Sequence, residues 1–197
     1  MSNKRRVFVS LHHRNALSIR ENRKRLHYAA YHWGILISPK NLSHDDDDHH
    51  HHHHAFDVSD GIIQYAATAT ETTTTTTMES TDLNIDGNWH FRAEPNVNLA
   101  DKPHLLARVM IGKLPREVSY ADIHTLLEKI PLPQKDALPV QNCVSWTRAA
   151  IRTLQENGLA EKFDIDAFMD KALGFADQRL REYTTTSSCM NYTTRRM

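Results

Sequence analysis

The spacing of apolar residues changes near residue 118, and this change limits the fold more than any other feature of the sequence. Before that point, β-branched and aromatic residues gather in short runs that are typical of strands. After it, apolar residues recur at the three- and four-residue spacing of amphipathic helices. A strand-rich first half followed by helices predicts an α+β fold, in which an antiparallel sheet from the N-terminal half is packed on one side by the C-terminal helices.

Two polar tracts interrupt the predicted strands. We expect strands over 7–13, 31–38, 55–61, 88–94 and 105–114. The Asp- and His-rich tract at 41–54 and the Thr-rich tract at 68–81 contain too few apolar residues to join a core. Both are therefore predicted to be low-complexity insertions, and the basic run RENRKR at 20–25 is predicted to be a solvated loop.

The second half shows three helix starts. Ser119 and Asp122 form a capping signal for a helix that Pro131 ends, Asn142 can cap a second helix that Gly158 ends, and a third begins near Asp164. The residues after 184 are polar and lack periodicity. We therefore expect a single domain over 1–183 and a disordered tail over 184–197.

Charge and targeting signals narrow the possible partners. The chain has 24 Lys and Arg residues against 24 Asp and Glu residues, so its net charge gives no reason to expect a specific nucleic-acid partner. No export signal or membrane span is visible, and two cysteines do not make a disulfide framework. We expect an intracellular protein, cytoplasmic or nuclear, with both thiols reduced.

The segment QNCVSW places Cys143 where the second helix should begin. A cysteine in the apolar arc of a first turn can be a small hydrophobic residue that fills space beneath Trp146. It can also be a nucleophile, because the helix N-terminus stabilises a thiolate and its free N–H groups can hold an oxyanion. The segment alone leaves both interpretations open.

A nucleophilic thiol needs a proton acceptor, which should come from a strand that faces the start of the helix. His32 lies at the beginning of the strand YHWGILIS and is the candidate. If the chain then forms a hairpin, the next strand offers Asp57, on the side opposite to Phe56, to orient the imidazole. His90 is a rival third member that the sequence does not exclude.

The histidine-rich tract suggests metal binding, since imidazole is a common ligand of transition metals. The tract comprises His44 and the run 49–54, within a segment with no scaffold to fix a ligand geometry. We therefore expect neither a metal site nor a cofactor.

These residues together resemble a known group. An early strand histidine in HWGILI, a polar residue on the next strand and a late N-C pair that opens a helix are similar to the circularly permuted papain-like superfamily, which includes the permuted relatives of the NlpC/P60 peptidases, the lecithin:retinol acyltransferase group and the PPPDE isopeptidases. The chain is most similar to small uncharacterised fungal proteins with a YHW-aliphatic-SPK segment (31–40) and an NC-x-x-W helix start (142–146). The resemblance covers roughly residues 7–175.

The resemblance implies a permuted papain-like fold with Cys143 as nucleophile, His32 as base and Asp57 as the orienting residue, where the acyltransferase group has a second histidine. It implies a cysteine hydrolase or acyltransferase acting on an amide, isopeptide or ester carbonyl of a protein, peptide or lipid. The alternative is a catalytically inactive papain-like interaction module, in which the basic segment 20–25 contacts a partner.

Overall fold

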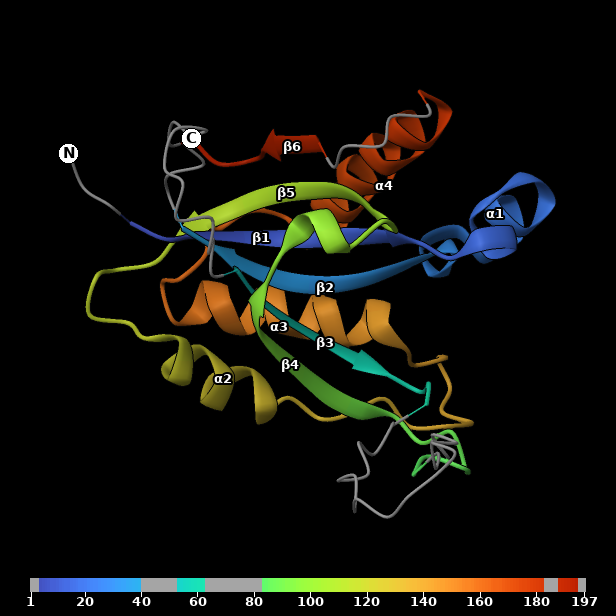
Figure 1. The fold of residues 1–197 in the computed structure, drawn as a ribbon, viewed down its shortest axis with the longest axis horizontal. Coiled ribbons are helices and arrows are strands. Elements are labelled where there is room, and N and C mark those ends of the chain that lie inside the picture. Colours follow the sequence, from blue (N-terminus) through green and yellow to red (C-terminus); the bar gives the residue numbers. More distant parts are fainter. Residues whose placement is uncertain (1–3, 40–52, 63–82, 183–187, 195–197) are drawn as a thin grey trace, which may run out of the picture.

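The computed structural model describes residues 4–39, 53–62, 83–182 and 188–194, which form a mixed α+β fold. Six strands make one sheet in the order β4-β3-β2-β1-β5-β6 (Figure 1). The strands are β1 (Arg6–His13), β2 (Tyr31–Ser38), β3 (His53–Ser59), β4 (His90–Val97), β5 (Leu105–Lys113) and β6 (Ser188–Asn191). The α-helices are α1 (Arg20–Leu26), α2 (Tyr120–Glu128), α3 (Cys143–Glu156) and α4 (Ile165–Arg181), and the short 3-10 turns are η1 (Asn15–Ser18), η2 (His27–Ala30) and η3 (Leu99–Asp101).

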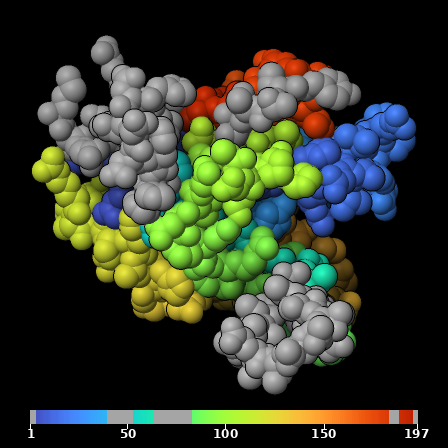
Figure 2. Space-filling model, viewed as in Figure 1, coloured from blue at the N-terminus to red at the C-terminus, as the bar shows by residue number. Residues whose placement is uncertain are grey.

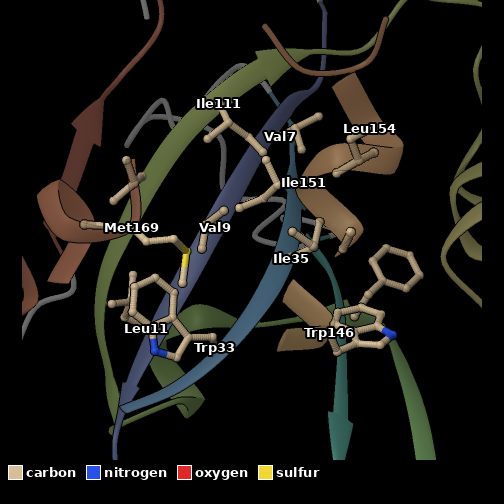
Figure 3. Packing of buried hydrophobic residues seen from close by; sticks show 14 of the residues in the cluster. Val7, Val9, Leu11, Trp33, Ile35, Ile111, Trp146, Ile151, Leu154 and Met169 are labelled. Atoms are coloured by element: carbon tan, nitrogen blue, oxygen red, sulfur yellow. The ribbon is translucent and has the colours of Figure 1, made fainter. Parts of the chain in front are cut away.

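One face of the sheet carries the main core. α3 packs on β2 and β3, and α4 packs on β5, so the two long helices lie side by side on this face. Every second residue of these strands points toward the two helices. Figure 3 shows Val9, Leu11 and Ile35 facing Ile151 and Met169. These side chains are fully buried. The apolar residues with strand periodicity and those with helical periodicity therefore pack against each other in one hydrophobic layer.

The opposite face is covered differently. Here Phe8, Leu36 and Met110 form a separate small cluster, against which Leu99 of η3 packs. The connection from β4 to β5, which contains η3, crosses this face in front of β1 and β2 (Figure 1). In the space-filling view the same residues, in light green, cover the centre of the sheet (Figure 2). We call this the open face because no α-helix packs on its centre.

The predicted strands and helices are present. Two further elements, α1 and β6, lie where the sequence predicted a loop and a disordered tail. The basic run at 20–25 is not a loop but forms α1, because Arg23 makes two hydrogen bonds of 2.7 Å to Asp177 of α4 and holds the segment in place. The predicted disordered tail is wrong for residues 188–191, which form β6 and pair in parallel with β5. Met190 and Tyr192 pack against the main core, which explains why this segment is ordered.

The predicted insertion over 41–54 also ends earlier than expected. His53 and His54 belong to β3, and His53 is buried with its Nδ1 2.8 Å from Ser38 Oγ. The ring of His54 stacks on Tyr120 at 3.5 Å between centroids. These two histidines are therefore held by the fold, contrary to the expectation for the tract. The rest of that tract and the predicted insertion over 68–81 lie outside the described residues.

Candidate active site at the start of helix α3

The first turn of α3 is fixed by a reciprocal cap. The side-chain oxygen of Asn142 accepts a hydrogen bond from the backbone N–H of Val144 at 2.8 Å, and Ser145 Oγ accepts one from the backbone N–H of Asn142 at 2.9 Å. Cys143 is the first residue of the helix and is 3% exposed. The cap does not use the N–H of Cys143, so this donor lies beside the thiol, where an oxyanion could form.

His32 and Asp57 lie next to each other on neighbouring strands. His32 Nε2 is 3.1 Å from Asp57 Oδ2. Gly34 makes this arrangement possible, because a Cβ at Gly34 would come within 2.9 Å of the Phe56 carbonyl oxygen and 3.1 Å of Asp57 Cβ. Any larger residue there would push β3 away from β2 and separate the histidine from the carboxylate.

The hydrogen-bonded ladder between β2 and β3 ends before it reaches His32 and Asp57. The paired residues run from Ile35–Phe56 to Ile37–His54, and among the described residues no pairing continues toward His32. His32 and Asp57 belong to the open face by strand alternation, whereas Cys143 belongs to the helix-side core. The thiol nevertheless lies close enough to the imidazole for its interaction with His32 to raise the pKa of that residue. With Nε2 directed at Asp57, Nδ1 is the ring nitrogen that remains for the thiol.

The charges of the site reinforce one another. Burial lowers the pKa of His32, but hydrogen bonds to Asp57 and Cys143 and the charges of both residues outweigh it and raise the pKa from 6.5 to about 9. Burial raises the pKa of Asp57, but hydrogen bonds to His32 and Arg92 hold that pKa well below its usual range. At neutral pH the site therefore contains an imidazolium and a carboxylate.

Arg92 is a site residue that the sequence did not reveal. It lies directly across from Asp57 on β4 and binds it in a bidentate manner, Nε to Oδ1 at 2.7 Å and Nη2 to Oδ2 at 2.9 Å. The strand NWHFRAE was visible in the sequence, but the register that pairs Asp57 with Arg92 was not. Arg92 fixes the carboxylate that in turn holds His32.

His90, the rival third member, lies elsewhere. It pairs with Ser59 across the β3–β4 ladder, and its Nδ1 is 3.4 Å from the backbone oxygen of Asn88. The structure brings Asp57, and not His90, into hydrogen-bond contact with His32.

A second histidine adjoins the site. His12 pairs with His32 across the β1–β2 ladder, and their rings meet edge to face with centroids 6.0 Å apart. Burial, followed by the charge of His32, lowers the pKa of His12 from 6.5 to about 3. His12 is therefore neutral beside a charged imidazole. The sequence shows HH at 12–13, but only the strand register identifies which imidazole faces His32.

Neither a metal nor a membrane feature occurs in the described part of the chain. No three His, Cys, Asp or Glu side chains within 4–39, 53–62, 83–182 and 188–194 are grouped so that they could hold a metal ion. Over the same ranges, no helix combines the length and the apolar character that crossing a bilayer requires.

Comparisons with known proteins identify a family but no function. A model described as "Family of unknown function (DUF6914)" matches residues 4–192, and the chain therefore belongs to this family. Neither a curated protein nor a solved structure matches the chain. The matched range includes Cys143, His32, Asp57 and Arg92.

Proposed function

We propose that this member of the DUF6914 family is a cysteine hydrolase or acyltransferase that acts on an amide, isopeptide or ester carbonyl. The observation that carries the proposal is the set of neighbours of His32. One ring nitrogen is held by Asp57, and a thiol at the start of a helix lies close enough to the ring to raise its pKa. A thiol, a base and an orienting carboxylate in this order are what covalent acyl transfer requires.

The chemistry follows from the positions of these groups. Cys143 Sγ attacks the carbonyl carbon as a thiolate, and the C–O π electrons move to oxygen, which the N–H of Cys143 stabilises. The tetrahedral intermediate collapses, its C–N or C–O bond breaks, and the leaving group takes the proton held by His32. Water or another nucleophile then attacks the thioester while His32 removes its proton, and the thiolate leaves.

The fold is compatible with a permuted papain-like arrangement, which we propose on the basis of the sequence resemblance. The base and the orienting residue come from consecutive strands, β2 and β3, and the nucleophile opens a later helix that packs on them. This is the order that the resemblance implies, and Asp57 takes the position of the orienting residue.

The proposal is tested by trapping the acyl-enzyme. The protein is incubated with an activated ester of a short acyl chain, and intact mass is measured for the parent, for Cys143→Ala and for Cys189→Ala. We expect the acyl adduct in the parent and in Cys189→Ala, and its loss in Cys143→Ala. An adduct that survives Cys143→Ala would overturn the proposal.

One observation favours a second candidate, a catalytically inactive interaction module. Cys143 is only 3% exposed, and the cavity beside His32 and Asp57 is not lined by Cys143. In this case the triad is a packed remnant, and Cys143 reacts slowly with iodoacetamide whether or not His32 is present. The basic segment is a less suitable partner surface than the sequence suggested, because Arg23 is already bound to Asp177.

A further inference from the structure

A cavity of about 170 Å³ lies on the open face of the sheet. Its floor includes Ser10 and His12 of β1 and His32 of β2, and its wall includes Leu99 and Lys102 from the connection between β4 and β5. Figure 1 shows this connection crossing the face that carries the floor residues. The cavity shares His32, Asp57 and Arg92 with the candidate active site but lies on the opposite side of the sheet from α3.

Positive charge exceeds negative charge around this cavity. Its two carboxylates are already paired: Asp57 binds His32 and Arg92, and Glu94 accepts hydrogen bonds of 2.7 and 2.8 Å from Lys102 Nζ. Because the raised pKa of His32 keeps its imidazole protonated at neutral pH, the cations His32, Arg92 and Lys102 face two carboxylates, and one positive charge is left over. A site with satisfied carboxylates and excess cations favours an anion.

A buried arginine beside the cavity adds to this charge. Arg108 pairs with the floor residue Ser10 across the β1–β5 ladder and is only 7% exposed. Its Nε and Nη1 have no hydrogen-bond partner in the described structure, and its guanidinium lies 5.8 Å from the centre of the Phe8 ring. An uncompensated buried cation is costly, and an anion nearby would offset part of that cost.

The floor offers neutral hydrogen-bonding groups as well as space. Ser10 is 4% exposed and contributes a hydroxyl, and His12 contributes a neutral imidazole. Gly34 lies between Ser10 and Asp57 on the neighbouring strand, and a Cβ at that position would stand 3.4 Å from Ser10 Oγ. Because Gly34 has no side chain, no atoms fill the space of the cavity between Ser10 and Asp57.

We propose that this cavity binds a small anion, as a free carboxylate or phosphate or as such a group on a larger metabolite. Lys102 is the cation at its wall, Ser10 is the donor on its floor, and Arg108 supplies charge from the adjacent strand. The proposal goes beyond the acyl-transfer function: the cavity shares His32, Asp57 and Arg92 with the candidate active site but not Cys143, so anion binding does not require the thiol chemistry.

The test uses the Cys143→Ala protein, so that thiol chemistry plays no part. Inorganic phosphate and acetate are titrated separately, with sodium chloride at matched ionic strength as the reference, and the melting temperature is measured. We expect a saturable rise with at least one of the two anions. A rise with phosphate alone identifies a phosphate ligand, and a rise with acetate alone identifies a carboxylate.

Three variants in the same background locate the site. Lys102→Met should weaken anion binding by about tenfold, the value of one charge-assisted hydrogen bond, and Arg108→Met should weaken it by a smaller factor. Arg116→Met makes the same change of charge at an exposed position and should leave binding unchanged. The proposal is wrong if neither anion gives a saturable rise, or if all three variants weaken binding equally.

Discussion

The two cysteines of this chain occupy contrasting surroundings. Cys143 opens a long helix near the imidazole of His32, whereas Cys189 lies half-buried on the edge strand β6 beside Arg108. Burial raises the pKa of Cys189, although the charges of Arg108 and Arg6 oppose this effect. An imidazole can take a proton and return it, whereas a guanidinium only supplies charge. On the proposed function, the neighbouring side chain is what distinguishes Cys143 from Cys189 as a candidate for acyl transfer.

The largest expected effect is the loss of covalent chemistry at one cysteine and its survival at the other. Cys143→Ala should abolish thioester formation with an activated ester, because no second thiol of the described structure has a neighbouring base. Cys189→Ala should retain it. The measurement is intact mass after incubation with the ester. Equal loss in both variants would show that the contrast between the two thiols has no chemical consequence.

The next effect concerns the imidazole. His32→Ala should lower the rate of iodoacetamide alkylation at Cys143 at pH 7 by about tenfold or more, because the sulfur loses the neighbouring positive charge of His32. Alkylation at Cys189, followed by peptide mass in the same sample, is the internal control and should not change. If Cys143 reacts at the same rate with and without His32, the thiol is a core residue and the inactive module becomes the better description.

The third effect concerns the carboxylate of Asp57, which acts on the pKa of His32 independently of the thiol. Asp57→Asn should move the pKa of His32 from about 9 back toward 6.5, as followed by the ring proton shifts in an NMR titration. Because the folded-state pKa is raised, protonated His32 stabilises the fold fully below pH 6.5, and this contribution disappears as pH rises through about 9.

The stability difference between the parent and Asp57→Asn should therefore be at most about 3.5 kcal/mol below pH 6.5 and shrink toward pH 9, because each tenfold change in the proton affinity of the imidazole corresponds to roughly 1.4 kcal/mol. Urea unfolding at several pH values measures this difference. A difference that does not depend on pH would show that Asp57 does not hold the charge on His32.

The smallest effect is expected at Arg92. Its side chain is 50% exposed, so Arg92→Met should cost only about 0.5–1 kcal/mol of stability despite the bidentate contact with Asp57. The same variant should raise the pKa of His32 slightly, because it removes a positive charge near the imidazolium. Arg116→Met is the matched control because it removes the same charge at an exposed position. A loss of acyl-enzyme formation comparable to that in Cys143→Ala would assign Arg92 a direct role in catalysis.

Most of the fold could be predicted because each element buries one face. The alternation in YHWGILIS and the helical spacing after Asn142 are properties of the local sequence, and both elements are present at the expected residues. The capping residues Ser119 and Asn142 act within one turn, so they could also be read directly. By contrast, α1 and β6 depend on distant contacts, with Asp177 and with β5, which leave no local pattern.

The candidate site divides in the same way. The sequence could predict Cys143, His32 and Asp57 as site residues, because each occupies a recognisable place in a helix start or a strand. Arg92 and His12 could not, since their roles depend on the register of the ladders that place them opposite Asp57 and His32. A shift of one residue would turn either side chain to the other face of the sheet.

By itself, the sequence determined most of the strands and helices, α1 and β6 excepted, and which face of each is apolar, because hydrophobic period and capping are local. Only the tertiary structure decided that His32 meets Asp57 instead of His90, that Cys143 lies near enough to the imidazole to raise its pKa, and that His32 and Asp57 line a cavity. These facts depend on strand order and register, which are set by the packing of the whole sheet and are not encoded in any one segment.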